Sequence, residues 1–401
     1  MVKRVFKAFE YRDFRLMWLG ACTSSIGTWM QKLAQSWLVL ELSKSSFLLG
    51  LDSFLGEIPI LLFSLVGGVV ADRRDRRHLL IASQLIQMTC AFLLAFLLAT
   101  NLVKVPYILA LSFCTGLAQA FGGPAYQALI PRLVKSEDLP NAIGLNSIQF
   151  NLARIIGPVI GGITMAKLGA TWCFSLNGLS FIAVIISLLM LHERYVPAEN
   201  RQSMLESMKE GINFIRKREG LEPLIVLAFL MTLLGVPLIV FLPVFARDVF
   251  QAGPNTYSLL LSVSGAGSVT GALGVATFGH IRQKGKFALV MLILLGTLIV
   301  GFSLSKVLWL SCVLLFIAGA ALISCFVMIS SLVQLITADE MRGRVMSVYN
   351  VAFRGGMPIG SLATGALIPI YSAPSVLAAN GVLLAFLGLY FLLVNRKVAA
   401  L

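Results

Sequence analysis

Three ionisable residues stand inside long apolar stretches of the chain, where charge is costly. Asp52 and Glu57 lie within the second stretch, and Lys32 lies within the first. Ionised groups at membrane depth pair with one another or face a cavity. Residues 52 and 57 are about 140° apart around a helix, so they cannot point the same way. We expect one carboxylate to pair with Lys32 and the other to bind and release a proton, with Glu57 ahead because it lies deeper. The alternative is a purely structural ion pair.

Other kinds of chemistry find no support in the sequence. The three histidines, His78, His192 and His280, are not clustered, and the six cysteines show no CxxC spacing. No nucleophile lies beside a base in a recognisable pattern, and no Walker A sequence is present. We therefore expect a protein that is not an enzyme, with no catalytic residue, metal site or cofactor.

The elements that must hold these charges are long apolar helices. The chain of 401 residues is 58% apolar and only 12% charged, about half the charge of an ordinary soluble protein. A membrane-spanning helix needs about 20 mainly apolar residues, and twelve runs approach or exceed that length. They cover roughly 16–40, 47–70, 78–100, 105–129, 141–165, 171–191, 223–246, 256–279, 286–304, 307–332, 345–370 and 374–394. The prediction is an all-α membrane protein.

The net charge of +14 is distributed as a topology signal. With twelve spans and both termini inside the cell, the cytoplasmic segments hold 24 Lys and Arg residues and the outer segments hold 5. Such a bias is typical of cytoplasmic loops. We expect a multi-pass protein of the bacterial cytoplasmic membrane with both termini cytoplasmic, and no nucleic-acid partner.

The twelve runs fall into two halves of six. A first bundle over 1–191 and a second over 223–401 are separated by a polar linker over 192–222. The linker contains an amphipathic helix that we expect at the cytoplasmic membrane surface, with a partner-binding helix as the alternative.

The two halves also repeat in sequence. Arg154 and Pro158 recur 200 positions later as Arg354 and Pro358, and Asn177-Gly178 recurs as Asn380-Gly381. Two pseudo-symmetric six-helix bundles are an architecture that allows alternating access to a site near the midplane.

A charged loop between the second and third runs resembles motif A of the major facilitator superfamily. The stretch GVVADRRDRR matches at Gly68, Asp72, Arg73 and Arg76, and Arg77 replaces a lysine. The resemblance implies that Asp72 caps the second helix and faces the start of the eleventh when the transporter is open to the outside. A carboxylate near a helix N-terminus gains about 0.3–1 kcal/mol. Asp75 stands where the family has glycine, so the loop turn is expected to differ.

A second stretch resembles motif C of the drug antiporters of this superfamily. Gly157, Pro158, Gly161 and Gly162 match it, and Gly144 stands where its first glycine belongs. Gly157 and Gly161 are spaced for close helix packing. The alternative is ordinary glycine packing with no role in export. In the second half, Gly356, Pro358 and Gly360 look like the same device.

Arg154 and Arg354 each stand four residues before a proline inside an apolar run. They could bind substrate, or they could bond carbonyl groups and the motif A loop. We favour the second role because each side chain would extend towards the cytoplasm.

Over its whole length the chain resembles the branch of the superfamily that includes enterobactin exporters and macrolide efflux proteins. The resemblance implies the major facilitator fold and a proton-coupled exporter of amphipathic, drug-like or siderophore-like molecules. An importer or a lysolipid flippase on the same fold is the first alternative, and a transport-inactive scaffold or sensor is the second. We expect a monomer whose partners are a small amphipathic substrate, protons and membrane lipids.

Overall fold

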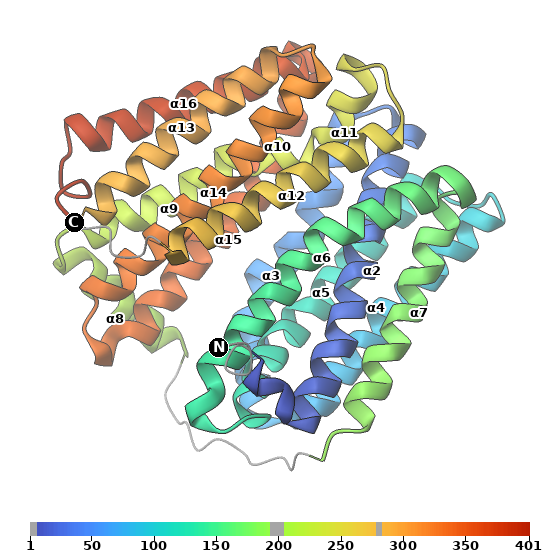
Figure 1. Ribbon diagram of the computed structural model, residues 1–401, viewed down its shortest axis with the longest axis horizontal. Helices are drawn as coiled ribbons and strands as arrows, with labels where there is room; N and C mark the ends of the chain where they lie inside the picture. Colours follow the sequence, from blue (N-terminus) through green and yellow to red (C-terminus); the bar gives the residue numbers. More distant parts are fainter. Residues whose placement is uncertain (1–5, 193–203, 278–282) are drawn as a thin grey trace. The chain divides into compact units, whose positions relative to one another are not determined.

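The structure is a computed structural model that describes residues 6–192, 204–277 and 283–401. Within them, the side chains of Asp72 and of residues 204–207 lie outside the description. Every regular element is helical, with no strand in the described part of the chain (Figure 1).

The chain divides into two units. The first comprises Met1–Ser43 and Leu55–Arg201, and the second comprises Lys44–Phe54 and Gln202–Leu401. The start of the second long helix therefore groups with the second unit, although the sequence prediction assigned it to the first bundle. Within each unit, membrane helices approach one another closely where their crossing points carry small residues.

Six long helices build the first unit, except for the start of α3, which groups with the second. Their bounds are α2 (Arg12–Ser43), α3 (Ser46–Arg73), α4 (Arg76–Ala99), α5 (Val105–Leu129), α6 (Leu139–Leu168) and α7 (Ala170–Leu189). Short 3-10 turns precede α2 and connect α5 to α6, namely η1 (Lys7–Glu10), η2 (Ile130–Arg132) and η3 (Ser136–Asp138).

The second unit begins with α8 (Met204–Lys217), which lies in the predicted linker. Its first long segment is broken into α9 (Leu221–Gly235), α10 (Pro237–Val240), α11 (Leu242–Val244) and the π-helix η4 (Phe245–Val249). The breaks precede Pro237 and Pro243, because proline lacks the N–H that continues a helix. The remaining elements are α12 (Pro254–Thr277), α13 (Lys284–Leu304), α14 (Leu308–Ile336), η5 (Asp339–Met341), α15 (Arg342–Tyr371) and α16 (Ala373–Leu393).

The long helices are long enough to cross a membrane. Eleven of the described segments are also apolar enough to do so. The twelfth is α2, which has 32 residues but carries Lys32 and several Gln and Ser residues along its length. The twelve predicted runs thus correspond to twelve long helical segments.

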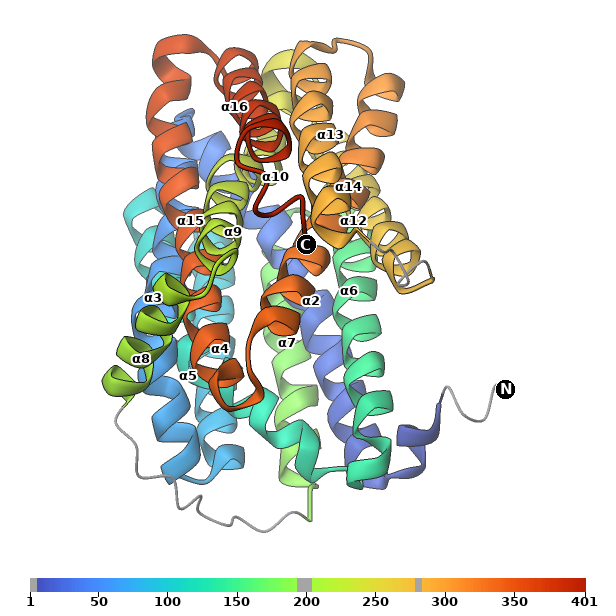
Figure 2. The ribbon, with the colours of Figure 1, turned by 90° about the vertical axis from the view of Figure 1, so that its left-hand side faces the viewer.

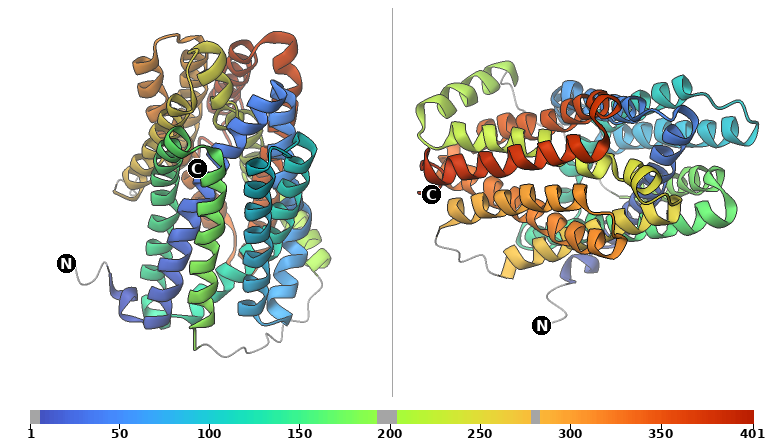
Figure 3. Two further views of the ribbon diagram at one scale, coloured as in Figure 1. Left: turned by 90° about the vertical axis from the view of Figure 1, so that its right-hand side faces the viewer. Right: turned by 90° about the horizontal axis from the view of Figure 1, so that it is seen from above.

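The same pairs of helices pack together in each unit. In the first, α2 packs on α6 and α7, and α4 packs on α5 and α7 (Figure 2). In the second, α9 packs on α15 and α16, and α13 packs on α14 and α16 (Figure 3). The repeat seen in the sequence is therefore matched by a repeat in helix pairing.

Glycines sit at equivalent crossings in both units. A Cβ atom added to Gly116 of α5 would collide with the Gly56 carbonyl of α3. In the second unit, one added to Gly319 of α14 would collide with the Ser264 carbonyl of α12. Close backbone approach at these crossings needs residues without a side chain.

The linker helix α8 docks on α15. Glu210 Oε2 lies 2.8 Å from Arg344 Nη1, and a Cβ atom on Gly211 would lie 2.8 Å from the Arg344 carbonyl. Ile215 of the same helix is buried. Part of the apolar face that we expected to meet the membrane surface therefore packs against protein.

Candidate functional site

The structure pairs Lys32 with Glu57. Lys32 Nζ lies 3.8 Å from Glu57 Oε1, with 56% and 27% of the two side chains exposed. Lys32 stands eleven residues before the end of α2, and Glu57 stands eleven residues after the start of α3. Because a short connection joins the two antiparallel helices, the charges meet at the same level. The sequence had left open which carboxylate would pair with the lysine.

Asp52 lies in the part of α3 that groups with the second unit. Its residue exposure is only 7%, and its neighbourhood is tightly packed. Ser53 Oγ donates to Ser361 Oγ of α15 at 3.4 Å, and a Cβ atom on Gly50 would lie 2.5 Å from the Ser361 carbonyl. We expected the carboxylate that does not pair with Lys32 to exchange the proton, with Glu57 ahead, whereas the structure pairs Glu57 itself with the lysine. With Lys32 held by Glu57, protonation of Glu57 would release the lysine as well.

Two cationic side chains lie over the indole ring of Trp29. Lys32 Nζ lies 5.5 Å from the ring centroid, and Arg154 Cζ also lies 5.5 Å from it. Phe150 meets the same indole edge-on, with 6.4 Å between ring centroids. Trp29 and Lys32 are one turn apart on α2, and Phe150 and Arg154 are one turn apart on α6. The result is a cluster of two cations and two aromatic rings, with Glu57 as its anion.

The glycines of the motif C stretch bring α6 close to α2. A Cβ atom on Gly157 would lie 2.5 Å from Trp29 Cβ and 2.8 Å from the Ile26 carbonyl. One on Gly161 would lie 3.0 Å from Met30 Cγ. Arg154 stands one turn before Gly157, so this close crossing carries its guanidinium to the indole.

The position of Arg154 differs from the one we favoured. Arg154 stands at the middle of α6, and it makes no hydrogen bond or ion pair with any residue that the structure describes. We had expected it to bond carbonyls or the motif A loop. Instead, the crossing of α2 and α6 places the guanidinium of Arg154 over the indole ring of Trp29. A cation in that position is attracted to the ring.

Side-chain hydrogen bonds join α2 to α5, α6 and α7 inside the first unit. Gln35 Nε2 donates to Ser112 Oγ at 2.8 Å, and Asn177 Nδ2 donates to Gln31 Oε1 at 2.6 Å. Gln149 donates to Ser25 Oγ at 2.6 Å. Sequence reasoning did not select these residues. The signal was available in the many Gln and Ser residues of α2, which make it the least apolar of the long helices.

The motif A loop is held by its arginines. Arg76 donates to the carbonyls of Ala71 and Ala128, at 3.2 and 3.1 Å, and so ties the end of α3 to the end of α5. Arg73 is exposed. The side chain of Asp72 lies outside the described residues, so the gating role implied by the resemblance stays a prediction. A Cβ atom on Gly68 would meet no described atom within 4 Å.

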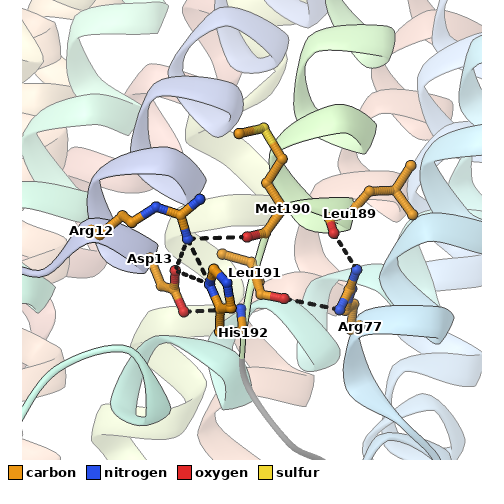
Figure 4. A network of polar contacts seen from close by, with 7 residues as sticks. All are labelled: Arg12, Asp13, Arg77, Leu189, Met190, Leu191 and His192. Atoms are coloured by element: carbon orange, nitrogen blue, oxygen red, sulfur yellow. Dashed lines mark hydrogen bonds and ion pairs between the residues drawn. The ribbon is translucent and has the colours of Figure 1, made fainter.

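Arg77 caps the end of α7. It donates to the carbonyls of Leu189 and Leu191, the latter at 3.0 Å (Figure 4). Beside it, His192 N donates to Asp13 Oδ2 at 3.1 Å, and Arg12 lies 2.6 Å from His192 Nδ1. The start of α2, the start of α4 and the end of α7 therefore meet at one end of the first unit.

Asp75 explains why the loop can depart from the glycine of motif A. Its carboxylate accepts hydrogen bonds from the backbone N–H groups of Arg77 and His78, at 2.8 and 3.4 Å. This is an N-cap of α4, a position where aspartate is strongly favoured. The Asp75 side chain thus stabilises the turn at the position where motif A has a glycine.

A second polar cluster joins the N-terminal turn to α6 at the same end. Asp138 lies 2.8 Å from Lys7 Nζ and accepts a hydrogen bond from the Tyr11 hydroxyl at 2.8 Å. These hydrogen bonds raise the pKa of Lys7 and the pKa of Tyr11, because the first favours the charged amine and the second favours the neutral phenol.

The remaining predicted glycines differ in their packing. A Cβ atom on Gly356 would collide with Thr232 and the Phe229 carbonyl of α9, and one on Gly360 would collide with the Leu233 carbonyl. One on Gly144 would meet no described atom within 4 Å. Pro158, Gly162 and Pro358 are buried inside their helices, and Arg354 is exposed.

A cavity of about 400 Å³ lies in the second unit. Its lining comes from α14 and the start of α15, with Phe326, Ser330, Gln334 and Arg342 among the residues. Arg342 pairs with Asp339. No residue that the sequence singled out lines this cavity. We therefore place the candidate site at the charges of the first unit. The described residues contain no group of three or more His, Cys, Asp or Glu that could hold a metal.

Relatives of the chain include a staphyloferrin A transporter, a macrolide efflux protein and an enterobactin exporter. It is 23% identical over 382 residues to the staphyloferrin A transporter of Staphylococcus aureus, covering 93% of this chain and 94% of that protein. It is 26% identical over 371 residues to macrolide efflux protein A of Streptococcus pyogenes, covering 88% and 89%. It is 26% identical over 390 residues to the enterobactin exporter EntS of Shigella boydii, covering 95% and 91%.

Solved structures share the fold. The nucleoside transporter NupG superposes with a TM-score of 0.74 at 14% identity, covering 94% of this chain and 98% of that one. A peptide transporter of the POT family gives a TM-score of 0.76 at 14% identity, covering 96% and 94%. These likenesses establish the fold of the chain.

A family model described as transmembrane secretion effector matches residues 4–400, nearly the whole chain. Eleven helices of the described residues are long and apolar enough to span a membrane, and the named relatives are transporters and not enzymes. The chain is therefore a multi-pass membrane protein of a transporter family. It belongs to the transmembrane secretion effector family of the major facilitator superfamily.

Proposed function

We propose that the chain exports amphipathic small molecules in exchange for protons, by alternating access. The observation that carries the proposal is the Lys32–Glu57 ion pair, which lies eleven residues from the connected ends of α2 and α3. Charges at that depth are costly and mark ion pathways in transporters. The relatives named above, which carry siderophores and macrolides, support an efflux role with substrates of this kind.

The pair gives the site two electrostatic states. With Glu57 ionised, Lys32 is neutralised by its partner, and the carboxylate can accept hydrogen bonds from a substrate. With Glu57 protonated, the carboxyl group is neutral and a weaker acceptor, and Lys32 loses its anionic partner. A proton and a hydrogen-bonding group of the substrate then compete for one carboxylate, which is the requirement for exchange.

Reconstituted vesicles with an imposed pH gradient test this mechanism. The wild-type protein should move substrate against its concentration gradient, and a proton uncoupler should abolish that movement. Glu57→Gln keeps the shape of the side chain and removes its titration, so uphill transport should be lost while downhill exchange continues. Glu41→Gln is the matched control, because Glu41 is an exposed carboxylate near the end of α2. Uphill transport by Glu57→Gln would contradict the mechanism.

We also propose that the chain lies in the bacterial cytoplasmic membrane with both termini and the 192–222 linker in the cytoplasm. The start of α2, the motif A loop and the end of α7 meet at one end of the first unit, and that end is rich in arginine. Arginine-rich ends favour the cytoplasmic side. A cysteine introduced at position 205 should resist an impermeant thiol reagent added outside intact cells. Rapid labelling at position 205 would contradict the proposed cytoplasmic placement of the linker.

A further inference from the structure

We propose that Arg154, Trp29 and Phe150 form a binding place for a flat acidic group of the transported molecule. The proposal rests on the transport function above and narrows its substrate to one chemical class. That class is an amphipathic acid whose carboxylate, or similarly acidic oxygens, lie on or next to an aromatic ring.

Arg154 supplies the anion contact. Its guanidinium stands at the middle of α6 and makes no hydrogen bond or ion pair with a described residue. An arginine carries five N–H donors in a rigid planar fork. A charge at this depth is retained where it serves a ligand or an ion pathway, and the fork matches a carboxylate through two parallel hydrogen bonds.

The two rings supply the apolar contact. The Trp29 ring centroid lies 5.5 Å from Arg154 Cζ, while Phe150 meets Trp29 edge-on and has half of its surface exposed. Phe150 and Arg154 project from successive turns of α6. A ligand with an aromatic ring can therefore pack on Phe150 while its acidic group reaches Arg154.

The charge balance selects an acid over a base. Lys32 and Glu57 neutralise one another at 3.8 Å. Arg154 then remains as the one positive charge of this cluster without an anion among the described residues. A cationic ligand would be repelled by it, and a neutral ligand would leave it unpaired.

Equilibrium binding of 1-naphthoate and 1-naphthamide to the purified full-length protein in detergent tests the inference. The two probes match in size and differ in charge. The wild-type protein should bind the acid about tenfold more tightly than the amide, which corresponds to about 1.4 kcal/mol. Arg154→Gln should remove this preference while its affinity for the amide stays unchanged, which also shows that the site is folded. Arg154→Lys should keep the charge but lose part of the preference, since its ammonium cannot form the fork.

Arg354→Gln is the matched control. Arg354 is the equivalent arginine of the sequence repeat, is exposed, and makes no hydrogen bond or ion pair with a described residue. It should retain the full preference for the acid. The inference is overturned if the wild-type protein does not distinguish the probes, if both Arg154 variants keep the preference, or if Arg354→Gln loses it equally.

These binding measurements need no gradient. A failed preference would therefore leave proton-driven export of another substrate standing. Uphill transport by Glu57→Gln would instead remove the proposed exchange mechanism and leave the acid preference intact.

Discussion

The crossing of α2 with α6 and the crossing of α9 with α15 are built alike but carry different side chains. Gly157 of α6 fits against Ile26, Trp29 and Met30, and Gly356 of α15 fits against Phe229, Thr232 and Leu233. By these contacts Trp29 corresponds to Thr232. The first crossing holds an indole with two cations, whereas Thr232 at the second is buried and donates to carbonyls of its own helix.

The register of the arginines explains the difference. The packing glycines of the two crossings are 199 residues apart, but Arg154 and Arg354 are 200 apart. The residue that corresponds to Arg154 by packing is therefore Phe353, whose ring is tilted by 40° against that of Phe326 with centroids 4.5 Å apart. Arg354 follows it and lies about 100° further around the helix. Duplication has thus preserved the glycine scaffold, and the charged cluster belongs to the first unit.

Adding a methyl group at the shared glycines should produce the largest effect. Gly360→Ala would drive Cβ into the backbone carbonyl of Leu233, and Gly157→Ala would bring it 2.5 Å from Trp29 Cβ. Overpacking of this kind costs about 1–3 kcal/mol, so both variants should unfold at lower temperature in detergent. Gly144→Ala is the control, since Cβ there meets no described atom within 4 Å. Equal stability of all three variants would show that the crossings are not closely packed.

Removing the indole should separate the two crossings functionally. Trp29→Leu deletes the ring on which Arg154 and Lys32 rest, and a cation–π contact contributes about 0.5–2 kcal/mol. Naphthoate binding should weaken several-fold. Phe353→Leu, at the corresponding place in the second unit, should leave naphthoate binding unchanged. Similar losses in both variants would mean that the two crossings contribute equally to binding.

A smaller effect is expected at the motif A loop of the first unit. Asp75→Ala removes the N-cap of α4 and should lower the free energy of unfolding by about 1 kcal/mol. Asp75→Asn should retain most of the stability because asparagine caps equally well. Thermal melts of the two variants beside the wild-type protein measure the difference. Identical melts for Asp75→Ala and wild type would argue against the cap.

The smallest effect should come from alkaline pH acting on the Asp138 cluster. The pKa of Lys7 and the pKa of Tyr11 are both raised by hydrogen bonds to Asp138. A group whose pKa is raised on folding stabilises the protein below its unfolded pKa and loses that contribution as pH rises through its folded pKa. The wild-type advantage over Tyr11→Phe in melting temperature should therefore shrink above about pH 10. A difference in melting temperature between wild type and Tyr11→Phe that grows with pH would contradict this prediction.

Much of the fold could be predicted from the sequence because membrane-spanning helices are recognised by their length and apolar composition. The twelve helices could be predicted in this way, as could the packing role of Gly157 and Gly161. The partner of Lys32 could not be predicted, because Asp52 and Glu57 both lie within its reach on the same helix. Which of them pairs with Lys32 depends on how α2 and α3 pack together. Arg154 was misjudged for a related reason. Its surroundings depend on a helix crossing that the chain position does not reveal.

The polar network of α2 shows what sequence reasoning overlooked. Gln31, Gln35 and Ser25 each hydrogen-bond to another helix of the first unit. Their types were visible, but polar residues on a spanning helix can face either protein or water. Only the packing of α5, α6 and α7 on that helix identifies their partners.

The central claim is that the proton-exchanging carboxylate belongs to the charged cluster of the first unit. Uphill transport in vesicles with an imposed pH gradient, compared between Glu57→Gln and Asp52→Asn, tests it most directly. Asp52 is the other acid deep in α3 and groups with the second unit. Glu57→Gln should lose at least about tenfold of the substrate accumulation, a change of about 1.4 kcal/mol or more, while Asp52→Asn should still accumulate substrate uphill. Loss of uphill transport in Asp52→Asn, with accumulation preserved in Glu57→Gln, would contradict it.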